Sequence, residues 1–190
     1  MTKIKNIYNF LDSKKTFKTL IILYAIISVV IFLFNLDAFS GDQYTYMYYA
    51  KGMHAGKYTY WYMLKDYVPD TFRNPGYPIF IYLFSFISDS MKLIKLTNFI
   101  AFATAIYLVF RIIDLYTKQP SYTIKNIFLF LMIFNSHLLI YIDFIFPEVI
   151  MFFLITLLVY LNIRLSKQKI STYIILGLLY GVIFQIRPVI

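Results

Sequence analysis

The sequence contains no cysteine and only two histidines among its 190 residues. Disulfide bonds and thiolate metal sites are therefore excluded, and a histidine-rich metal centre built on His54 and His137 is not expected. Charged residues are also scarce, at 14% of the chain, where a soluble domain has roughly 25%. Nothing in these counts indicates a metal or another cofactor, and we expect neither. The low charge also indicates that water is not the main solvent of this chain.

Hydrophobic residues make up 61% of the chain, and they come in long uncharged blocks. Blocks of about 18 or more such residues are typical of membrane-spanning helices. The first block is longer than the apolar core of a cleavable signal peptide, which has about 7 to 15 residues, so we expect an uncleaved anchor. We predict an all-α, polytopic membrane helix bundle whose five spans cover residues 19–36, 96–110, 127–142, 147–163 and 170–186.

The net charge of +9 does not indicate nucleic-acid binding, because the cations lie at the ends of the hydrophobic blocks. Their positions instead indicate how the chain is oriented across a membrane. Cytoplasmic loops of membrane proteins are enriched in Lys and Arg. Three groups of cations fall on one side of the predicted spans: Lys3, Lys5, Lys14, Lys15 and Lys18; Arg111, Lys118 and Lys125; Arg164, Lys167 and Lys169. We expect a multi-pass cell-membrane protein with a cytoplasmic N-terminus, membrane lipids as partners and no nucleic acid.

The first outer loop, 37–95, is too long for a simple connector, so we expect it to carry function. Its many tyrosines favour the lipid headgroup zone. A helical spacing, with Gly41 and Asp42 as a start signal and Gly56 as a stop, predicts a short amphipathic helix on the membrane surface. The residues that share its apolar face are Tyr46, Tyr49, Ala50 and Met53. The apolar stretch 77–87 is too short to cross a membrane and predicts a second interfacial or re-entrant helix.

Four charged side chains on the predicted outer side, in the first outer loop or at the ends of spans, could carry chemistry. Asp42 could act as a general base, or it could be a helix N-cap. Arg73 begins a rigid turn and could hold a phosphate with its forked guanidinium, or it could be a solvated turn residue. Glu148 could be a functional carboxylate at the membrane boundary, or it could only complement a helix dipole. Arg187 could bind a lipid phosphate, or it could snorkel to the headgroups.

Some uncharged residues within the apolar blocks also have an expected role. Gly177 and Gly181 have the spacing of small residues that permit close packing between membrane helices. Asn98 interrupts an otherwise apolar block, and an interhelical hydrogen bond is the expected reason. Neither expectation requires a catalytic role.

Together these features resemble the membrane glycosyltransferases of the GT-C superfamily, particularly the branch of the protein O-mannosyltransferases and the aminoarabinose transferase of lipid A. The order of the motifs along the chain and their placement relative to the spans carry the resemblance, which covers most of the chain from the first span onward. The matching elements are Gly41, Asp42, Gln43 and Tyr44; the segment 49–57; the turn 73–78; and Pro147 and Glu148, followed by Gly177, Gly181, Arg187 and Pro188.

The resemblance implies an inverting glycosyltransferase that moves a sugar from a polyprenyl-phosphate donor to an unknown acceptor on the extracytoplasmic side. Asp42 would be the catalytic base, and the outer helices would form a cavity for the lipid-linked donor. The departing phosphate gains charge, which Arg73 or Arg187 could stabilise.

Many members of this family have two acids at the start of the first loop, whereas Gln43 follows Asp42 here. Glu148 or Asp143 could supply the second carboxylate. Family members are usually longer, so we expect residues 1–190 to form one multi-pass domain, the N-terminal portion of a longer protein, which could be inactive alone.

Two other classes of protein remain open at this point. A polysaccharide polymerase or ligase also handles lipid-linked sugars, and its catalytic residues would lie in a large loop later in the chain. A transporter would carry ionisable residues inside its spans and half-helix pairs near the midplane. Here the acids instead gather on the predicted outer side: Asp42, Asp66, Asp70, Asp89, Asp143 and Glu148.

Overall fold

A computed structural model of the chain describes residues 2–35, 41–66, 73–88, 90–117, 122–135, 144–165 and 169–186. The regular secondary structure in these ranges is all α-helical, which confirms the predicted class. The helices are α1 (Thr2–Leu11), α2 (Lys14–Phe34), α3 (Asp42–His54), α4 (Gly76–Ser85), α5 (Met91–Thr117), α6 (Tyr122–Phe134), α8 (Pro147–Arg164) and α9 (Ile170–Ile186).

Three of these helices, α2, α5 and α8, are long and apolar enough to cross a membrane. The 21 residues of α2, at about 1.5 Å each, give about 31 Å, which matches a hydrocarbon core of about 30 Å. Helices α6 and α9 are apolar but shorter, and the second half of the predicted span 127–142 lies outside the described residues. The five-span count therefore stays a prediction.

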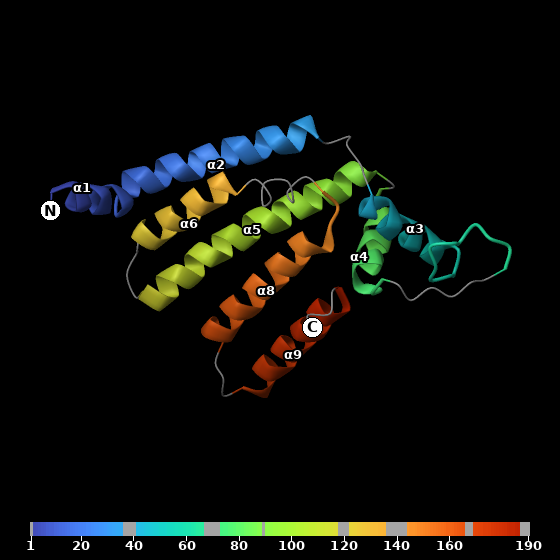
Figure 1. The fold of residues 1–190 in the computed structure, drawn as a ribbon. Helices are drawn as coiled ribbons and strands as arrows, with labels where there is room; N and C mark the ends of the chain where they lie inside the picture. The colour runs from blue at the N-terminus through green and yellow to red at the C-terminus, as the bar shows by residue number, and fades with distance from the viewer. Residues whose placement is uncertain are drawn as a thin grey trace.

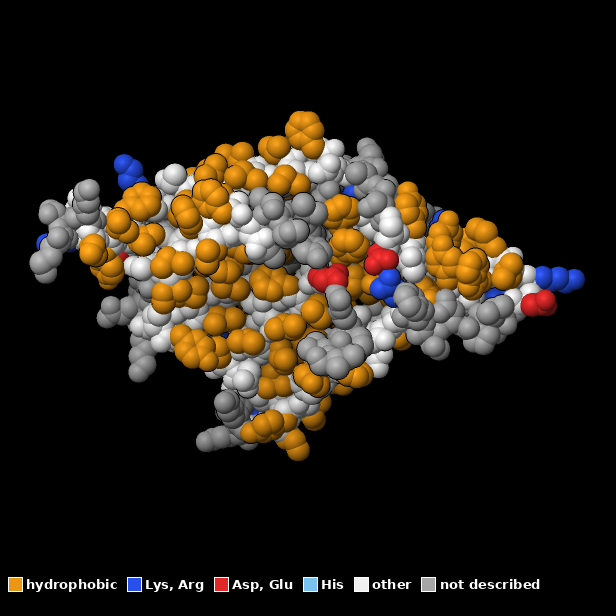
Figure 2. All heavy atoms as spheres, in the orientation of Figure 1, with side chains coloured by type: hydrophobic (Ala, Val, Ile, Leu, Met, Phe, Trp, Pro, Cys, Tyr) orange, Lys and Arg blue, Asp and Glu red, His pale blue; other side chains and the backbone are white. Residues whose placement is uncertain are grey.

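The long helices lie side by side, with α6 beside α2 and α9 beyond α8 (Figure 1). The tightest packing joins α5 to α8, where small residues such as Ala101 and Ala105 are buried on α5. Apolar side chains also cover much of the face shown in Figure 2. Only 17% of the apolar window of α2 is buried, so most of this helix presents its hydrophobic side chains outward, as a lipid-facing helix does.

Helices α3 and α4 sit together at one end of the long helices, and α1 projects from the other (Figure 1). Both short helices lie in the predicted segments. Three of the four residues on the predicted apolar face of α3 are buried inside the protein, so this face packs against the protein and not against a membrane surface, and the interfacial or re-entrant position of α4 stays a prediction. Gly41 and Gly56 flank α3 with positive φ values of 51° and 70°, which glycine adopts at little cost. Pro78 lies in the first turn of α4, where its missing N–H leaves no helical hydrogen bond unmade.

The start of α2, the end of α5, the start of α6, the end of α8 and the start of α9 share the end of the bundle from which α1 projects (Figure 1). The described cations in these segments are therefore gathered at this end: Lys14, Lys15, Lys18, Arg111, Lys125, Arg164 and Lys169. Lys118 and Lys167 lie outside the described residues. The side of a membrane that this end faces stays a prediction.

Candidate functional site

The structure brings Asp42 and Arg73, 31 positions apart, into an ion pair. Asp42 is the first residue of α3, and Arg73 lies three residues before α4. A terminal guanidinium nitrogen of Arg73, Nη2, donates a hydrogen bond to Asp42 Oδ1 over 2.7 Å. The Asp42 side chain is 54% exposed and that of Arg73 is 25% exposed. An ion pair with this much exposure contributes at most about 1 kcal/mol to stability, and the Asp42 carboxylate is the more exposed of the two partners.

Asp42 is not the N-cap of α3, so the capping role considered for it is wrong. The N-cap is Gly41, which has no side chain with which to cap the helix. Asp42 follows in the first turn, where the helix dipole favours an acid. Its carboxylate is directed to Arg73 and not to the backbone of its own helix.

Three tyrosines position Arg73. The guanidinium carbon lies 5.3 Å from the centre of the Tyr46 ring, within the range of a cation–π interaction. The Tyr58 hydroxyl donates a hydrogen bond to the Arg73 carbonyl over 2.5 Å, and the Tyr58 ring stacks on Tyr49 of α3 at 5.0 Å. The side chain and the backbone of Arg73 are therefore both tied to α3 and the segment that follows it. The sequence assigned these rings to the headgroup zone, and Tyr46 and Tyr49 also to the apolar face of a helix, but gave no sign of this positioning role.

A buried hydrogen bond between Asn98 and Tyr77 lies next to Tyr46, the ring that contacts Arg73. Tyr77, in the first turn of α4, is fully buried and meets Tyr46 edge to face at 5.1 Å. Asn98 of α5 donates hydrogen bonds from Nδ2 to the Tyr77 hydroxyl (3.0 Å) and to the Phe144 carbonyl (3.2 Å). These bonds confirm the interhelical role predicted for Asn98. They connect α4 and α5 to the segment that leads into α8.

Burial raises the pKa of the Tyr77 phenol far above its usual range, although the hydrogen bond with Asn98 acts in the opposite direction. The neighbouring Tyr46 and Glu148 raise it further. The phenol therefore stays neutral at physiological pH. Tyr77 belongs to α4, which is not one of the three helices long enough to cross a membrane.

Of the other predicted site residues, the structure describes Glu148. Glu148 follows Pro147 in the first turn of α8, and it is near enough to Tyr77 to interact with it electrostatically. Its Oε2 atom is buried. Asp143 and Arg187 lie outside the described residues. Figure 2 shows acidic and basic side chains close together on a largely hydrophobic face, at the junction of the long helices with α3 and α4.

An apolar cavity of about 770 Å³ begins next to this site. It lies among α4, α5, α8 and α9, and its walls include Ile79, Phe80, Leu83, Ile150, Phe153 and Leu178. Gly76 and Gln185 belong to its lining. The nearby Asn74 side chain donates a hydrogen bond to the Phe184 carbonyl over 3.3 Å, which ties the turn that carries Arg73 to α9.

The glycines around this cavity have two different roles. A Cβ atom at Gly76 would lie 2.6 Å from the backbone carbonyl atoms of Gln185, so only glycine lets α4 and α9 approach this closely. Gly177 and Gly181 also line the cavity, but within the described chain a Cβ at either would meet nothing within 4 Å. The close helix packing predicted for these two glycines is therefore wrong for the described residues, because they leave open space instead.

Gln43, the residue that follows Asp42, is a buried polar residue. Its burial was not predicted from the sequence. Its side chain is fully buried, and in the described part of the chain neither Oε1 nor Nε2 has a hydrogen-bond partner. Each such buried group costs about 1–3 kcal/mol. The residue that follows Asp42 is thus a buried amide, whereas Asp42 itself is exposed.

The chemical groups of the site are a carboxylate, a guanidinium and neutral tyrosine and amide side chains. Across the described ranges, no group of three or more His, Asp or Glu side chains could hold a metal ion. No protein-family model matches the sequence, and comparison with curated proteins and with solved structures finds no match.

Proposed function

We propose that this chain is the membrane domain of a GT-C-type glycosyltransferase, which transfers a sugar from a polyprenyl-phosphate donor to an acceptor on the extracytoplasmic side. The observation that carries the proposal is the 2.7 Å ion pair between Asp42 and Arg73 beside a large apolar cavity. A base, a cation for phosphate and room for a hydrocarbon chain are what this reaction needs in one place.

The proposed reaction is a displacement at the anomeric carbon with inversion. The acceptor oxygen or nitrogen attacks from the face opposite the phosphate, and the bond between the anomeric carbon and the phosphate oxygen breaks. The phosphate leaves with the bonding electrons, and Arg73 stabilises the added charge. Asp42 takes the proton from the acceptor as general base.

The ion pair suggests how donor binding prepares the base. In the ligand-free protein, the Asp42 carboxylate accepts a hydrogen bond from Arg73, so one of its oxygens is engaged by the guanidinium. An arriving phosphate offers the guanidinium a second anionic partner. As Arg73 turns toward the phosphate, Asp42 becomes available to the acceptor. Tyr58 and Tyr46 keep Arg73 beside both partners throughout this exchange.

The cavity suits the hydrocarbon part of the donor. Its described walls are mostly apolar, and a polyprenyl chain has no polar atom that would need a hydrogen bond there. With five spans and a cytoplasmic N-terminus, the cavity and the ion pair lie toward the extracytoplasmic leaflet. Arg187 as a second phosphate ligand and Glu148 as a second carboxylate belong to the same proposal.

The test is a transfer assay on the full-length protein in membranes with radiolabelled polyprenyl-phosphate sugars. Replacing a general base lowers the rate by about 10²- to 10⁴-fold, and we expect Asp42→Asn to lose activity on this scale. Asp66→Asn is the matched control, since Asp66 is an exposed acid of the same loop. Transfer by Asp42→Asn at the rate of the control would remove Asp42 from the mechanism and reject the proposal.

A further inference from the structure

Helix α1 has two chemically different faces. At about 100° per residue, its apolar side chains fall within an arc of about 160°, and they are Ile4, Ile7, Tyr8, Phe10 and Leu11. Lys5, Asn6 and Asn9 lie in the remaining arc. Lys3 falls within the apolar arc, at the N-terminal end of the helix. This division is typical of a helix that lies at the boundary between an apolar and an aqueous phase.

The apolar face of α1 is uncovered in the folded chain. Ile4 is 76% exposed, Ile7 is 61% exposed and Phe10 is 59% exposed. Single exposed hydrophobic residues are ordinary on a protein surface, whereas a continuous apolar face indicates a binding surface. The described packing of α1 is against α6, and it leaves this face open.

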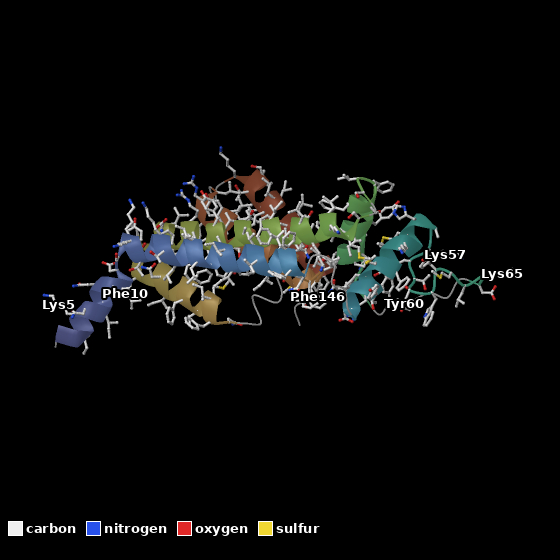
Figure 3. The ribbon with its side chains drawn as sticks, turned by 90° about the horizontal axis from the view of Figure 1, so that it is seen from above. Lys5, Phe10, Lys57, Tyr60, Lys65 and Phe146 are labelled. Atoms are coloured by element: carbon white, nitrogen blue, oxygen red, sulfur yellow. The ribbon has the colours of Figure 1, made fainter. Side chains whose placement is uncertain are left out.

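The joint between α1 and α2 is held by α6. Asn126 donates hydrogen bonds from Nδ2 to the Leu11 carbonyl (2.6 Å) and to the Ser13 carbonyl (3.2 Å). Thr123 donates a hydrogen bond to Asp12 Oδ1 over 3.0 Å. Figure 3 shows α1, which carries the labelled Lys5 and Phe10, bent away from the line of α2. Since α2 is long and apolar enough to cross a membrane, α1 lies where α2 enters it.

We propose that α1 is an interfacial anchor that binds the surface of an anionic lipid bilayer. Its apolar face enters the boundary between headgroups and acyl chains, and the lysines around the joint contact the lipid phosphates. Five lysines and one acid occur in residues 1–18: Lys3, Lys5, Lys14, Lys15 and Lys18, with Asp12. This charge complements anionic lipid and opposes pairing with a second copy of the same helix. The proposal does not depend on the transferase activity.

The absence of native cysteine allows a direct test with single-cysteine variants of the full chain in lipid nanodiscs, which leave both membrane surfaces accessible. Ile7→Cys reports on the apolar face, and Asn9→Cys is its matched control on the polar face. In nanodiscs containing phosphatidylglycerol, we expect a water-soluble maleimide to modify position 7 several-fold more slowly than position 9. In pure phosphatidylcholine, or at high salt, the difference should shrink, because a charge attraction is screened.

Lysine substitutions test the charge contribution separately. Removing one lysine near an anionic surface weakens binding by about fivefold, so Lys5→Gln with Lys14→Gln should largely abolish the protection of position 7. Lys65→Gln, which lies at the opposite end of the molecule from α1 in Figure 3, is the control and should leave the protection of position 7 unchanged. Equal modification rates at positions 7 and 9 would overturn the proposal. It would also be overturned if the protection of position 7 did not change with lipid charge or with the lysine substitutions. Protection that grows with protein concentration would instead assign the face to a second copy and overturn it as well.

Discussion

The Tyr58 hydroxyl donates a hydrogen bond to the backbone carbonyl of Arg73 over 2.5 Å. This bond connects the segment after α3 to the turn before α4, and Tyr49 supports it by stacking on Tyr58. It acts on the backbone of Arg73 and does not use the guanidinium. Tyr58 is therefore a positioning residue for the site, placed to fix where Arg73 can reach.

Replacing Tyr58 with Phe removes this hydrogen bond and keeps the stacked ring. A hydrogen bond of this kind contributes about 0.5–1.5 kcal/mol, so we expect the transfer rate to fall by about 2- to 10-fold. The effect should appear mainly in kcat, since the proposed charge stabilisation by Arg73 is strongest in the transition state. Tyr44→Phe, an exposed tyrosine of α3, is the control in the same assay. Kinetics of Tyr58→Phe indistinguishable from this control would contradict the positioning role.

The helices near the site were predictable because their signals are local. Two glycines with positive φ flank α3, and Pro147 is the first residue of α8. The sequence predicted these limits from residues that commonly start or stop helices. Membrane character was predicted from the length and apolarity of the blocks, and three described helices are long and apolar enough to cross a membrane. These features depend on residues within a few turns of one another, which is the range over which a sequence pattern carries structural information.

The contacts of the site were not predictable from such patterns. The cap prediction for Asp42 was wrong because Gly41, one residue earlier, takes the special backbone conformation. For the described residues, the packing prediction for Gly181 was wrong because the spacing of small residues does not say whether another helix lies against them. The bond from Tyr58 to Arg73 and the burial of Gln43 depend on how α3 meets α4. That arrangement is a property of tertiary packing.

Gly76→Ala should destabilise the protein, because the added methyl group would lie 2.6 Å from the backbone of Gln185. Overpacking against a backbone costs about 1–3 kcal/mol, and the displaced contact is the one that holds α4 to α9. Gly181→Ala is the matched control on α9, where the methyl group meets open space and the gain in helix propensity is favourable. We expect thermal unfolding in detergent to occur at a lower temperature for Gly76→Ala only. Equal melting temperatures for the two variants would show that α4 and α9 do not pack this closely.

The raised pKa of Tyr77 predicts a loss of stability at alkaline pH. In the unfolded chain the phenol has a pKa of about 10, whereas in the folded protein burial keeps it protonated to a higher pH. Its stabilising contribution is therefore complete below about pH 10 and is lost as pH rises from there toward the folded-state pKa, by at most about 1.4 kcal/mol per pH unit. Tyr77→Phe should unfold with a shallower dependence on pH above 10 than wild type. An unchanged slope would mean that Tyr77 is not buried as described.

Gln43→Met should stabilise the fold. The substitution keeps the length of the side chain and removes two buried polar groups that lack hydrogen-bond partners among the described residues, so the free energy of unfolding should rise by about 1–3 kcal/mol. Gln185→Met, at an exposed position of α9, is the control and should leave the melting temperature nearly unchanged. A melting temperature that falls in Gln43→Met would contradict the prediction, because it would show that the amide is satisfied in the folded protein. A rise together with slower sugar transfer would show that the amide serves the reaction at a cost in stability.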